Sequence, residues 1–414
     1  MPEQATLQRN DARDARRAII VGGSMSGLFA GLMLRRRGIE VDIYERVESE
    51  LAGRGAGIVA QPIVAKTLRD LGIDAAGLGV ESTTRKVFDP TGNLVCTIEC
   101  PQTLTAWERL YRILRDAFPA ERYHRGVGLK SFAQDADAVT AFFSDGASAR
   151  ADVLIGADGI RSTVRTHLLA QLQPLYAGYV AWRSLIPEAA IPPAIHRELF
   201  MYMSFCLPPG EQFLGYPVAG SDNDLRPGHR RYNVVWYRPA DEHGELRRLL
   251  TDESGVTHSI SIPPPLIRAE AIAAMRADAD RLVSPQFRVI AALMDEPVLQ
   301  PIYDLETPQM AFGRVAILGD AAFVARPHVG AGVSKAIDDA AALVDALAGN
   351  DVEPALKQFE AQRLPIGRRI IERARHLGAY LQAARTLEDE ARSARHSNAE
   401  AVIRETATID FLQT

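Results

Sequence analysis

Residues 18–45, AIIVGGSMSGLFAGLMLRRRGIEVDIYE, decide the fold. The block AIIV is β-branched, GGS is a turn, and the following apolar helix is closed by Gly38 before a second strand-like block, EVDIY. A strand, a glycine turn, a helix and a strand within about 30 residues predict a βαβ unit. This internal punctuation argues against a membrane-spanning helix at 18–34, a run that is uncharged but short for a span.

The turn inside this unit resembles a phosphate-binding motif. Gly22 and Gly27 occupy the first and last positions of G-x-G-x-x-G, and Ser24 stands where the second glycine is usual. The first glycine allows the tight turn, and the last lets the helix and strand pack closely. A helix N-terminus binds phosphate through its unpaired N–H groups, and Glu45 ends the second strand where an acid binds ribose hydroxyls. The unit therefore predicts a bound dinucleotide.

Composition and charge narrow the class of protein. The chain has 414 residues, 47 Lys and Arg against 52 Asp and Glu, and 47% hydrophobic residues. This length predicts two or three domains, and the net charge of −5 argues against a nucleic-acid partner. Cys96, Cys100 and Cys206 form no disulfide framework and predict a cytoplasmic location. No Cys or His pair stands near Cys96 and Cys100, so we predict no metal site.

Two later segments repeat the strand–turn–helix pattern. The apolar run at 153–155 enters Asp158-Gly159, and the run at 314–318 enters Gly319-Asp320. Each segment alone also fits an ordinary turn with a solvated helix. An acid at a strand's carboxyl end can bind sugar hydroxyls, and the downstream Gly330 and Gly332 allow a flat ring to lie against the backbone.

Aromatic residues concentrate between 175 and 305, where alternating runs predict sheet. We therefore predict a mixed α/β (α+β) fold, in which a Rossmann-like domain is interleaved with a smaller, mainly antiparallel β-sheet domain and followed by C-terminal helices. The expected boundaries are a disordered tail at 1–14, the nucleotide-binding domain at 15–84, 105–174 and 306–360, the sheet domain at 85–104 and 175–305, and a helical segment at 361–414.

The three motifs in this order resemble the single-component FAD-dependent aromatic hydroxylases, the family of p-hydroxybenzoate hydroxylase. The resemblance runs from about residue 17 to 375. Short blocks look most like the hydroxypyridine monooxygenases of that family: GIVAQP at 57–62, ERYH at 121–124, YAGYVAWR at 176–183 and RPHVGAGVSKAIDDA at 326–340.

The resemblance implies an FAD enzyme with NADH or NADPH as electron donor and O2 as co-substrate. It implies hydroxylation of a small hydroxylated aromatic ring, a hydroxypyridine, through a flavin hydroperoxide. A phenol, a benzoate or another heterocycle is an alternative substrate, and a non-catalytic flavin-binding redox sensor is an alternative of another class. We expect a small aromatic substrate as partner, no nucleic acid, no membrane, and a homodimer as a further option.

The resemblance also assigns cofactor contacts. Several positions depart from the commoner pattern, with Trp107 for Arg, Phe323 for His, and Ala331 and Ser334 for Gln and Asn. The implied contacts are Gly22, Ser24, Gly27 and Glu45 for the ADP half, Arg54 for ribose or pyrophosphate, Asp158 and Gly159 for both FAD and NAD(P)H, Asp320 for the ribityl chain, and Gly330, Gly332 and Ser334 for the flavin's pyrimidine edge.

For the substrate, His328 is the expected group that favours a deprotonated ring hydroxyl, because imidazole titrates near neutral pH. A loop histidine bonded to backbone is an equal alternative. Pro327 lies in the same loop, and Tyr216, assigned a catalytic as well as a wall role, joins Gln61 and Trp236 around the ring. Plain core packing is the alternative for each wall residue.

Overall fold

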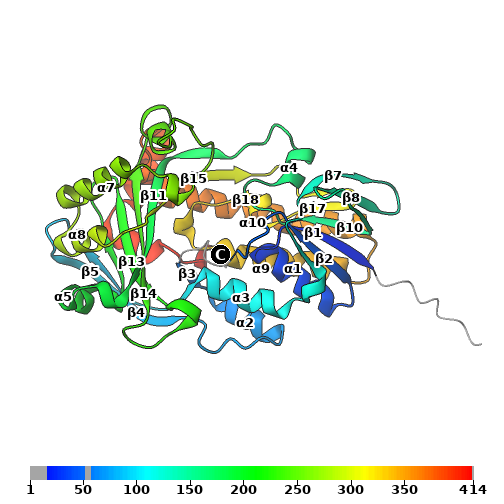
Figure 1. Cartoon of the computed structure of the whole chain (residues 1–414), viewed down its shortest axis with the longest axis horizontal. Helices are drawn as coiled ribbons and strands as arrows, with labels where there is room; N and C mark the ends of the chain where they lie inside the picture. Colours follow the sequence, from blue (N-terminus) through cyan, green and yellow to red (C-terminus); the bar gives the residue numbers. More distant parts are fainter. Residues whose placement is uncertain (1–15, 52–56, 413–414) are drawn as a thin grey trace, which may run out of the picture.

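A computed structural model of the chain describes residues 16–51 and 57–412. The expected tail at 1–14 and Arg54 lie outside the described residues. Three β-sheets form the frame, and helices cover them (Figure 1). The mixed α/β fold expected from the sequence is confirmed, because parallel strands with helices occur in one half and antiparallel strands in the other.

The first sheet contains the predicted βαβ unit. Helix α1 (Met25–Arg36) connects β1 (Arg17–Val21) to β2 (Glu40–Glu45), and β1 pairs in parallel with both β2 and β10 (Val153–Gly156). The AIIV block is buried throughout, as expected of a central parallel strand covered on both faces. The strand order is β16 (Ala311–Phe312), β17 (Val315–Ile317), β10 (Val153–Gly156), β1 (Arg17–Val21), β2 (Glu40–Glu45) and β6 (Tyr123–Arg125).

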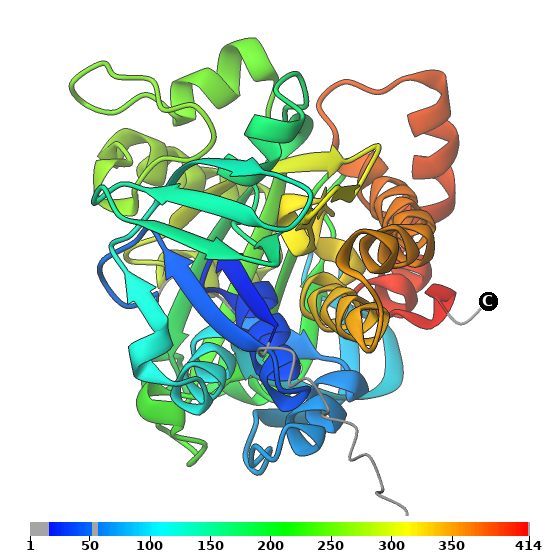
Figure 2. The same cartoon turned by 90° about the vertical axis from the view of Figure 1, so that its right-hand side faces the viewer.

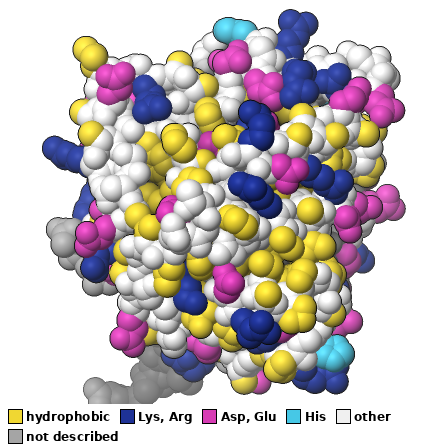
Figure 3. Space-filling model, turned by 90° about the vertical axis from the view of Figure 1, so that its left-hand side faces the viewer, with side chains coloured by type: hydrophobic (Ala, Val, Ile, Leu, Met, Phe, Trp, Pro, Cys, Tyr) yellow, Lys and Arg dark blue, Asp and Glu magenta, His cyan; other side chains and the backbone are white. Residues whose placement is uncertain are grey.

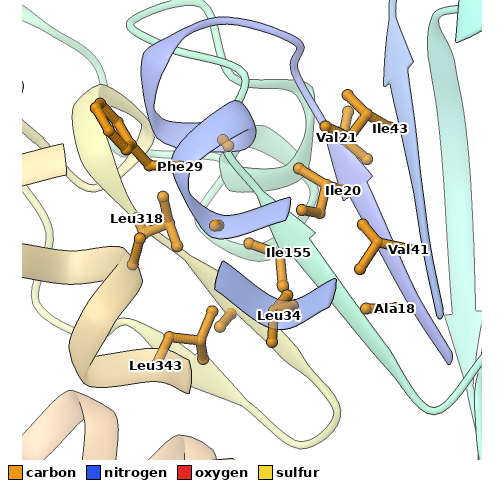
Figure 4. Packing of buried hydrophobic residues seen from close by; sticks show 14 of the residues in the cluster. Ala18, Ile20, Val21, Phe29, Leu34, Val41, Ile43, Ile155, Leu318 and Leu343 are labelled. Carbon is orange, nitrogen blue, oxygen red and sulfur yellow. The ribbon is translucent and has the colours of Figure 1, made fainter. Parts of the chain in front are cut away.

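Each face of this sheet has its own cover. Helix α9 (Gly332–Leu347) packs beside α1 on one face, and α10 (Val352–Gly378) packs against α9 (Figure 2). Figure 4 shows Ile20, Val41 and Ile155 of the strands in one cluster with Leu34 of α1 and Leu343 of α9. The other face carries a small antiparallel sheet made of β7 (Leu129–Gln134), β8 (Val139–Phe143) and β9 (Ser148–Ala151).

The large second sheet is antiparallel except where β12 pairs in parallel with β4. Helices α7 (Ala269–Leu282) and α8 (Pro285–Ala292) pack on one face through a buried cluster. The order is β18 (Phe323–Val324), β15 (Val298–Glu306), β11 (Leu175–Pro187), β14 (Arg231–Pro239), β13 (Gln212–Val218), β12 (Met203–Cys206), β4 (Val80–Phe88), β5 (Leu94–Ala106) and β3 (Gly57–Ala60).

The division into domains stays a prediction. The strand pairing indicates which of the boundaries expected from the sequence would shift. β3 was expected in the nucleotide-binding part, yet it pairs with β5 at the edge of the large sheet. The segment 399–412 returns from the C-terminal helices to lie between the two large sheets (Figure 1). The remaining helices are α2 (Pro62–Asp70), α3 (Trp107–Ala117), α4 (Thr163–Leu168), α5 (Pro193–Ile195), α6 (Arg247–Leu249), α11 (Leu387–His396) and α12 (Ala399–Glu405).

The apolar run at 18–34 is divided between β1 and α1, as its punctuation predicts. Among residues 16–51 and 57–412, no helix has the length and apolar character needed to cross a membrane.

Candidate functional site

Two adjoining cavities lie at the carboxyl ends of β1, β2 and β10. The nucleotide cavity, of about 270 Å³, is lined by Gly22, Glu45 and Asp158 among others. The inner cavity, of about 330 Å³, extends from there to the large sheet. Both are lined by Ser24, Trp107, Ala157 and Gly159, so the two cavities lie side by side. In an open α/β sheet this edge is where ligands bind.

The N-terminus of α1 opens onto both cavities through Ser24. The Ser24 side chain makes no capping bond within the described residues, so the first N–H groups of α1 remain available to an anion. Gly27 is required for packing, because an added Cβ would lie 1.9 Å from the Gly22 carbonyl oxygen. Gly22 itself has a φ of 106°, which side chains rarely adopt.

Glu45 organises the same loop from the end of β2. Its Oε2 accepts a hydrogen bond from the Gly23 N–H at 2.9 Å, and its Oε1 accepts one from the Val47 N–H at 2.9 Å. Each carboxylate oxygen has further lone pairs, so Glu45 can also accept bonds from sugar hydroxyls in the nucleotide cavity.

Asp158 uses its carboxylate to hold α4. It accepts bonds from the Ser162 hydroxyl at 2.5 Å, the Thr163 N–H at 2.6 Å and the Val164 N–H at 3.2 Å. Burial raises the pKa of this carboxyl, although these bonds lower it. Its side chain is therefore engaged with the protein, and Gly159 beside it faces both cavities.

Asp320 presents its carboxylate to the inner cavity, and 57% of that side chain is exposed. Lys335 lies behind it, almost wholly buried, with Nζ 3.3 Å from Asp320 Oδ1 and donating to the Phe323 carbonyl at 2.7 Å. The turn before Asp320 is fixed by a buried ion pair: Asp339 accepts from the Gly319 N–H at 3.0 Å and from Arg363 Nε at 2.7 Å. Asp320 is thus placed by a rigid turn.

The N-terminus of α9 also points into the inner cavity, where Gly330 and Gly332 line the wall. Gly330 has a φ of 63°, and an added Cβ would lie 2.6 Å from Cα of Ala407. Ala331 precedes the helix and has no side-chain acceptor with which to cap it. Ser334 is turned away, because its hydroxyl donates back to the Ala331 carbonyl at 3.1 Å.

These features fit FAD. One helix N-terminus suits the pyrophosphate, Glu45 and Asp320 suit the sugar and ribityl hydroxyls, and the second helix N-terminus suits a ring that becomes negatively charged on reduction. The two helix N-termini open onto the same space. The residues present therefore match the cofactor that the sequence predicts.

The large sheet closes the inner cavity with alternate side chains of β13 and β14. Leu214 and Tyr216 point to the cavity from β13, and Val235 and Tyr237 do so from β14. Burial raises the pKa of the Tyr216 hydroxyl, and the positive charge of Arg183 lowers it. Tyr216 thus lies in the wall as expected, and its catalytic role stays a prediction.

The prediction that Trp236 lies in the wall around the substrate ring is wrong. Its side chain lies on the opposite face of the sheet, fully buried, with Nε1 donating to Glu211 Oε2 at 2.8 Å and the ring stacked on Phe213. Successive strand residues point to opposite faces, so Trp236 and Tyr237 cannot both face the cavity. Tyr237 takes the wall position that was expected of its neighbour.

Gln61 is a second correction, since it lies outside the residues that line the inner cavity. Its Nε2 donates to the Ala407 carbonyl at 3.1 Å, while the Ala407 N–H donates to the His328 carbonyl at 2.6 Å. Gln61 therefore ties the C-terminal segment to the site, and Thr406 and Ala407 of that segment line the cavity instead.

His328 and Pro327 lie in the cavity wall, but the expectation that His328 titrates near neutrality is wrong. Burial, together with the charges of Arg326 and Arg183, lowers the pKa of His328 from 6.5 to about 3. Its Nε2 lies 2.8 Å from the Tyr179 hydroxyl. A neutral imidazole with this pKa does not hold a proton taken from a ring hydroxyl at pH 7.

Several cavity residues were not expected from the sequence, among them Arg183, Tyr237, Thr406 and Ala407. Arg183 and Tyr237 stand on strands whose facing depends on register, and Thr406 and Ala407 follow a helix far along the chain. For Arg183 one signal was present, since a single charged residue ends the otherwise uncharged run YAGYVAWR.

Comparisons with known proteins identify FAD-binding families and related monooxygenases. Family models described as "FAD binding domain-like" and "FAD binding domain" match residues 176–304 and 301–374. The chain is 33% identical to 2,6-dihydroxypyridine 3-monooxygenase of Paenarthrobacter nicotinovorans, over 88% of this chain and 91% of that protein. It is 30% identical to 3-amino-4-hydroxybenzoate 2-monooxygenase of Streptomyces cremeus, over 88% of this chain and 87% of that protein.

The fold agrees as well. The solved structure of 2,6-dihydroxypyridine-3-hydroxylase from Arthrobacter nicotinovorans superposes with a TM-score of 0.84 at 31% identity, covering 90% of this chain and 94% of that chain. The chain therefore belongs to the single-component FAD-dependent aromatic hydroxylases, the family of p-hydroxybenzoate hydroxylase, as an FAD monooxygenase that uses NAD(P)H and O2.

Proposed function

We propose that the protein hydroxylates a hydroxypyridine at a ring carbon. The observation that carries this proposal is the inner cavity of about 330 Å³, which joins the α9 N-terminus to a wall of apolar and tyrosine side chains. Such a space suits a flat ring with few polar substituents. The relative at 33% identity is named for a dihydroxypyridine, which supports the substrate class.

Bound FAD would supply the redox chemistry, accepting a hydride from NAD(P)H and passing one oxygen atom of O2 to the substrate ring. The chain's own residues do the rest. The α1 N-terminus, Glu45 and Asp320 would hold the cofactor, and the backbone N–H of Gly332 at the start of α9 would face its ring. The Gly330 N–H is already used within the loop, where it donates to the Pro327 carbonyl at 3.0 Å. The segment at Thr406 and Ala407 lines the cavity and would there help to exclude water, which would otherwise divert oxygen to hydrogen peroxide.

We assign Tyr216, Tyr237 and Pro327 to the substrate wall. His328 is assigned a positioning role, since its ring packs 4.2 Å from the Tyr237 ring and lies 2.8 Å from the Tyr179 hydroxyl. Substitution of His328 by Gln is then expected to raise the KM for the ring more than it lowers kcat. Arg54, Ser334 and the carboxylate of Asp158 stay predictions as cofactor contacts.

The direct test is to purify the protein, confirm FAD from its visible absorption, and add single aromatic compounds with NADH or NADPH and O2. A hydroxypyridine should accelerate NAD(P)H oxidation and yield a hydroxylated product in equal amount. The same panel includes phenols and benzoates. Oxidation that no aromatic compound accelerates would remove the hydroxylase proposal and favour the redox sensor.

A hydroxybenzoate is the second candidate substrate. The relative at 30% identity is named for an aminohydroxybenzoate, and among residues 16–51 and 57–412 the lining of the cavity includes Arg183, which could pair with a carboxylate. If benzoates stimulate turnover more than hydroxypyridines at equal concentration, this candidate replaces the first.

We also propose a cellular location and an oligomeric state. A cytoplasmic location rests on the three cysteines, which are free in the structure. We infer a homodimer, supported by Leu94 and Val95 of β5, which are 52% and 53% exposed. On the side of the molecule that lies at the left of Figure 1, where β5 is labelled, hydrophobic side chains lie among charged ones (Figure 3). Light scattering on the purified protein measures the mass, and a monomer at micromolar concentration would overturn the inference.

A further inference from the structure

Arg183 is a charged side chain in the inner cavity, and in the part of the chain that the structure describes no carboxylate pairs with it. It stands on β11, where Arg183 pairs with Val235 of β14 while the preceding Trp182 pairs with Trp236. Opposite residues of an antiparallel pair share a face, so Arg183 lies on the cavity face with Val235, and the two tryptophans lie beneath. The strand register therefore places a guanidinium group at the edge of an apolar wall.

The contacts of Arg183 are few. Nη2 reaches the Tyr237 hydroxyl at 3.5 Å, the outer limit for a hydrogen bond. Within residues 16–51 and 57–412, Nε is buried without a hydrogen-bond partner, and no carboxylate lies within ion-pair distance of the group. Three other arginines of this half pair with carboxylates: Arg230 with Glu188 at 2.8 Å, Arg238 with Glu211 at 3.1 Å, and Arg326 with Asp304 at 2.8 Å. The buried Arg85 instead donates to two backbone carbonyls and to Gln102.

The positive charge of Arg183 acts on the groups around the cavity. It lowers the pKa of Tyr216 and Tyr237 hydroxyls, against the larger raising effect of burial, and it helps to lower the pKa of His328. Asp320 is the carboxylate among the described residues of the wall, and it is paired with Lys335. A second, outer groove also has Arg183 in its lining, together with Arg161, His258, Asp295 and Glu296.

An unpaired guanidinium in a partly desolvated cavity favours an anion beside it. We propose that Arg183 binds the substrate as its oxyanion, pairing with the deprotonated ring oxygen and thereby selecting rings with an acidic hydroxyl. The planar fork of arginine can donate to the oxygen and to an adjacent ring nitrogen in one plane, the arrangement found in a 2-hydroxypyridine anion. This inference rests on the proposed function. It assigns to the positive charge of Arg183 the stabilisation of the deprotonated ring hydroxyl, a role that was expected of His328 as a base.

The consequence for the reaction is electronic. A deprotonated hydroxyl makes the ring more electron-rich than the neutral form, so the ring carbon attacks an electrophilic oxygen more readily. An opposite charge at about 4–6 Å lowers the pKa of an acid by about 1–3 units. Arg183 would thus hold the bound ring in its reactive form at pH values where the free ring is neutral.

The test compares 2,6-dihydroxypyridine, which can ionise, with 2,6-dimethoxypyridine, whose methylated oxygens cannot. FAD-loaded wild type and Arg183→Gln are titrated without NAD(P)H, and the change in flavin absorption gives the Kd of each probe between pH 5 and 9. The ultraviolet band of the bound dihydroxypyridine reports whether it is ionised. Arg238→Gln is the matched control, because Arg238 lies on the opposite face of the same sheet.

We expect Arg183→Gln to weaken dihydroxypyridine binding on the order of 10- to 100-fold, the effect of losing a charge-assisted hydrogen bond. Dimethoxypyridine binding should change less than about threefold, since that probe carries no charge. Arg183→Lys should recover part of the loss, and Arg238→Gln should match wild type. Wild-type protein should bind the ionised ring at a pH below the pKa of the free compound.

Two results would overturn the proposal: an unchanged Kd for dihydroxypyridine in Arg183→Gln, or equal losses for both probes, which would indicate a packing effect. If Arg183→Gln does not fold with FAD, the ultraviolet band of dihydroxypyridine bound to wild type tests the proposal instead. A neutral bound ring would then contradict it. If wild type neither binds nor hydroxylates dihydroxypyridine, the proposed function fails separately. The same titration with 4-nitrophenol and 4-nitroanisole then tests Arg183 alone.

Discussion

The two halves of this molecule build their parts of the site in different ways. The six-stranded sheet places the cofactor with backbone groups at short turns, where Gly22, Gly27 and Gly330 are needed for packing or for a positive φ. The nine-stranded sheet places the substrate wall with single side chains from neighbouring strands, such as Arg183, Tyr216 and Tyr237. A turn motif is contiguous in sequence, whereas a wall depends on strand register. Substitution of a few glycines in the first half should therefore abolish cofactor binding. Single substitutions in the second half should change substrate affinity one side chain at a time.

The largest expected effect is at Gly27. In Gly27→Ala the new Cβ would meet the Gly22 carbonyl oxygen at 1.9 Å, so the phosphate-binding turn cannot keep its shape. We expect purified Gly27→Ala to lose FAD, measured by visible absorption after gel filtration. Gly38→Ala at the other end of α1 is the control, because its Cβ meets nothing within 4 Å and only the φ of 78° is strained. It should keep FAD and lose about 1–2 kcal/mol of stability.

Next comes the buried ion pair behind Asp320. Arg363→Met leaves the Asp339 carboxylate unpaired at the turn that carries Gly319, and removal of one partner of a buried pair costs about 3–5 kcal/mol. Urea unfolding of the holoprotein measures the loss. Arg368→Met on the same helix is the control, since Arg368 is 51% exposed and its ion pair with Glu306 is worth at most about 1 kcal/mol. Equal losses in both variants would contradict a role of the buried pair in holding the turn.

In the second half, the substitutions Trp236→Phe and Tyr237→Phe test the roles of the two opposite faces of β14. Trp236→Phe removes a bond to the buried Glu211 carboxylate and should cost about 2–3 kcal/mol of stability with an unchanged substrate Kd. Tyr237→Phe removes only a long contact with Arg183, so it should change the substrate Kd with little loss of stability. A reversed pattern, with Trp236→Phe altering the substrate Kd, would contradict the assignment of faces.

A pH effect should follow from His328. Its pKa falls from 6.5 to about 3 on folding, so the unfolded chain binds the proton first as the pH decreases. The stability present above pH 6.5 is therefore lost as the pH falls toward 3, by about 1.4 kcal/mol per unit. Between pH 7 and 5, wild type should lose about 2 kcal/mol more than His328→Gln in urea unfolding. Parallel curves for the two proteins would contradict a neutral buried His328.

The contrast also explains what could be read from the sequence. The βαβ unit at 18–45, the position of Asp320 and the glycines at the start of α9 were all predicted, because each motif carries its own turn and strand end. β14 offered no such guide. Its residues from Tyr232 to Tyr237 are buried on both faces, so the alternation that would separate Trp236 from Tyr237 is absent from their composition.

Other parts of the site required long-range contacts that no local pattern encodes. Gln61 directly follows β3, whose residues line the cavity, but its side chain donates to the carbonyl of Ala407, which lies 346 residues further along the chain. Arg85 holds the same C-terminal segment by donating to the Ile403 and Thr406 carbonyls at 2.8 and 2.7 Å. The burial that lowers the pKa of His328 arises from this packing, which is why a side chain expected to titrate near pH 7 does not.

The most direct test of the central claim is turnover under ¹⁸O2 with 2,6-dihydroxypyridine and NAD(P)H, followed by mass spectrometry of the product. A ring hydroxylated within the inner cavity should carry one ¹⁸O atom for each NAD(P)H consumed, with little hydrogen peroxide. Unlabelled product, or NAD(P)H consumption that yields only peroxide with every aromatic compound of the panel, would contradict the account.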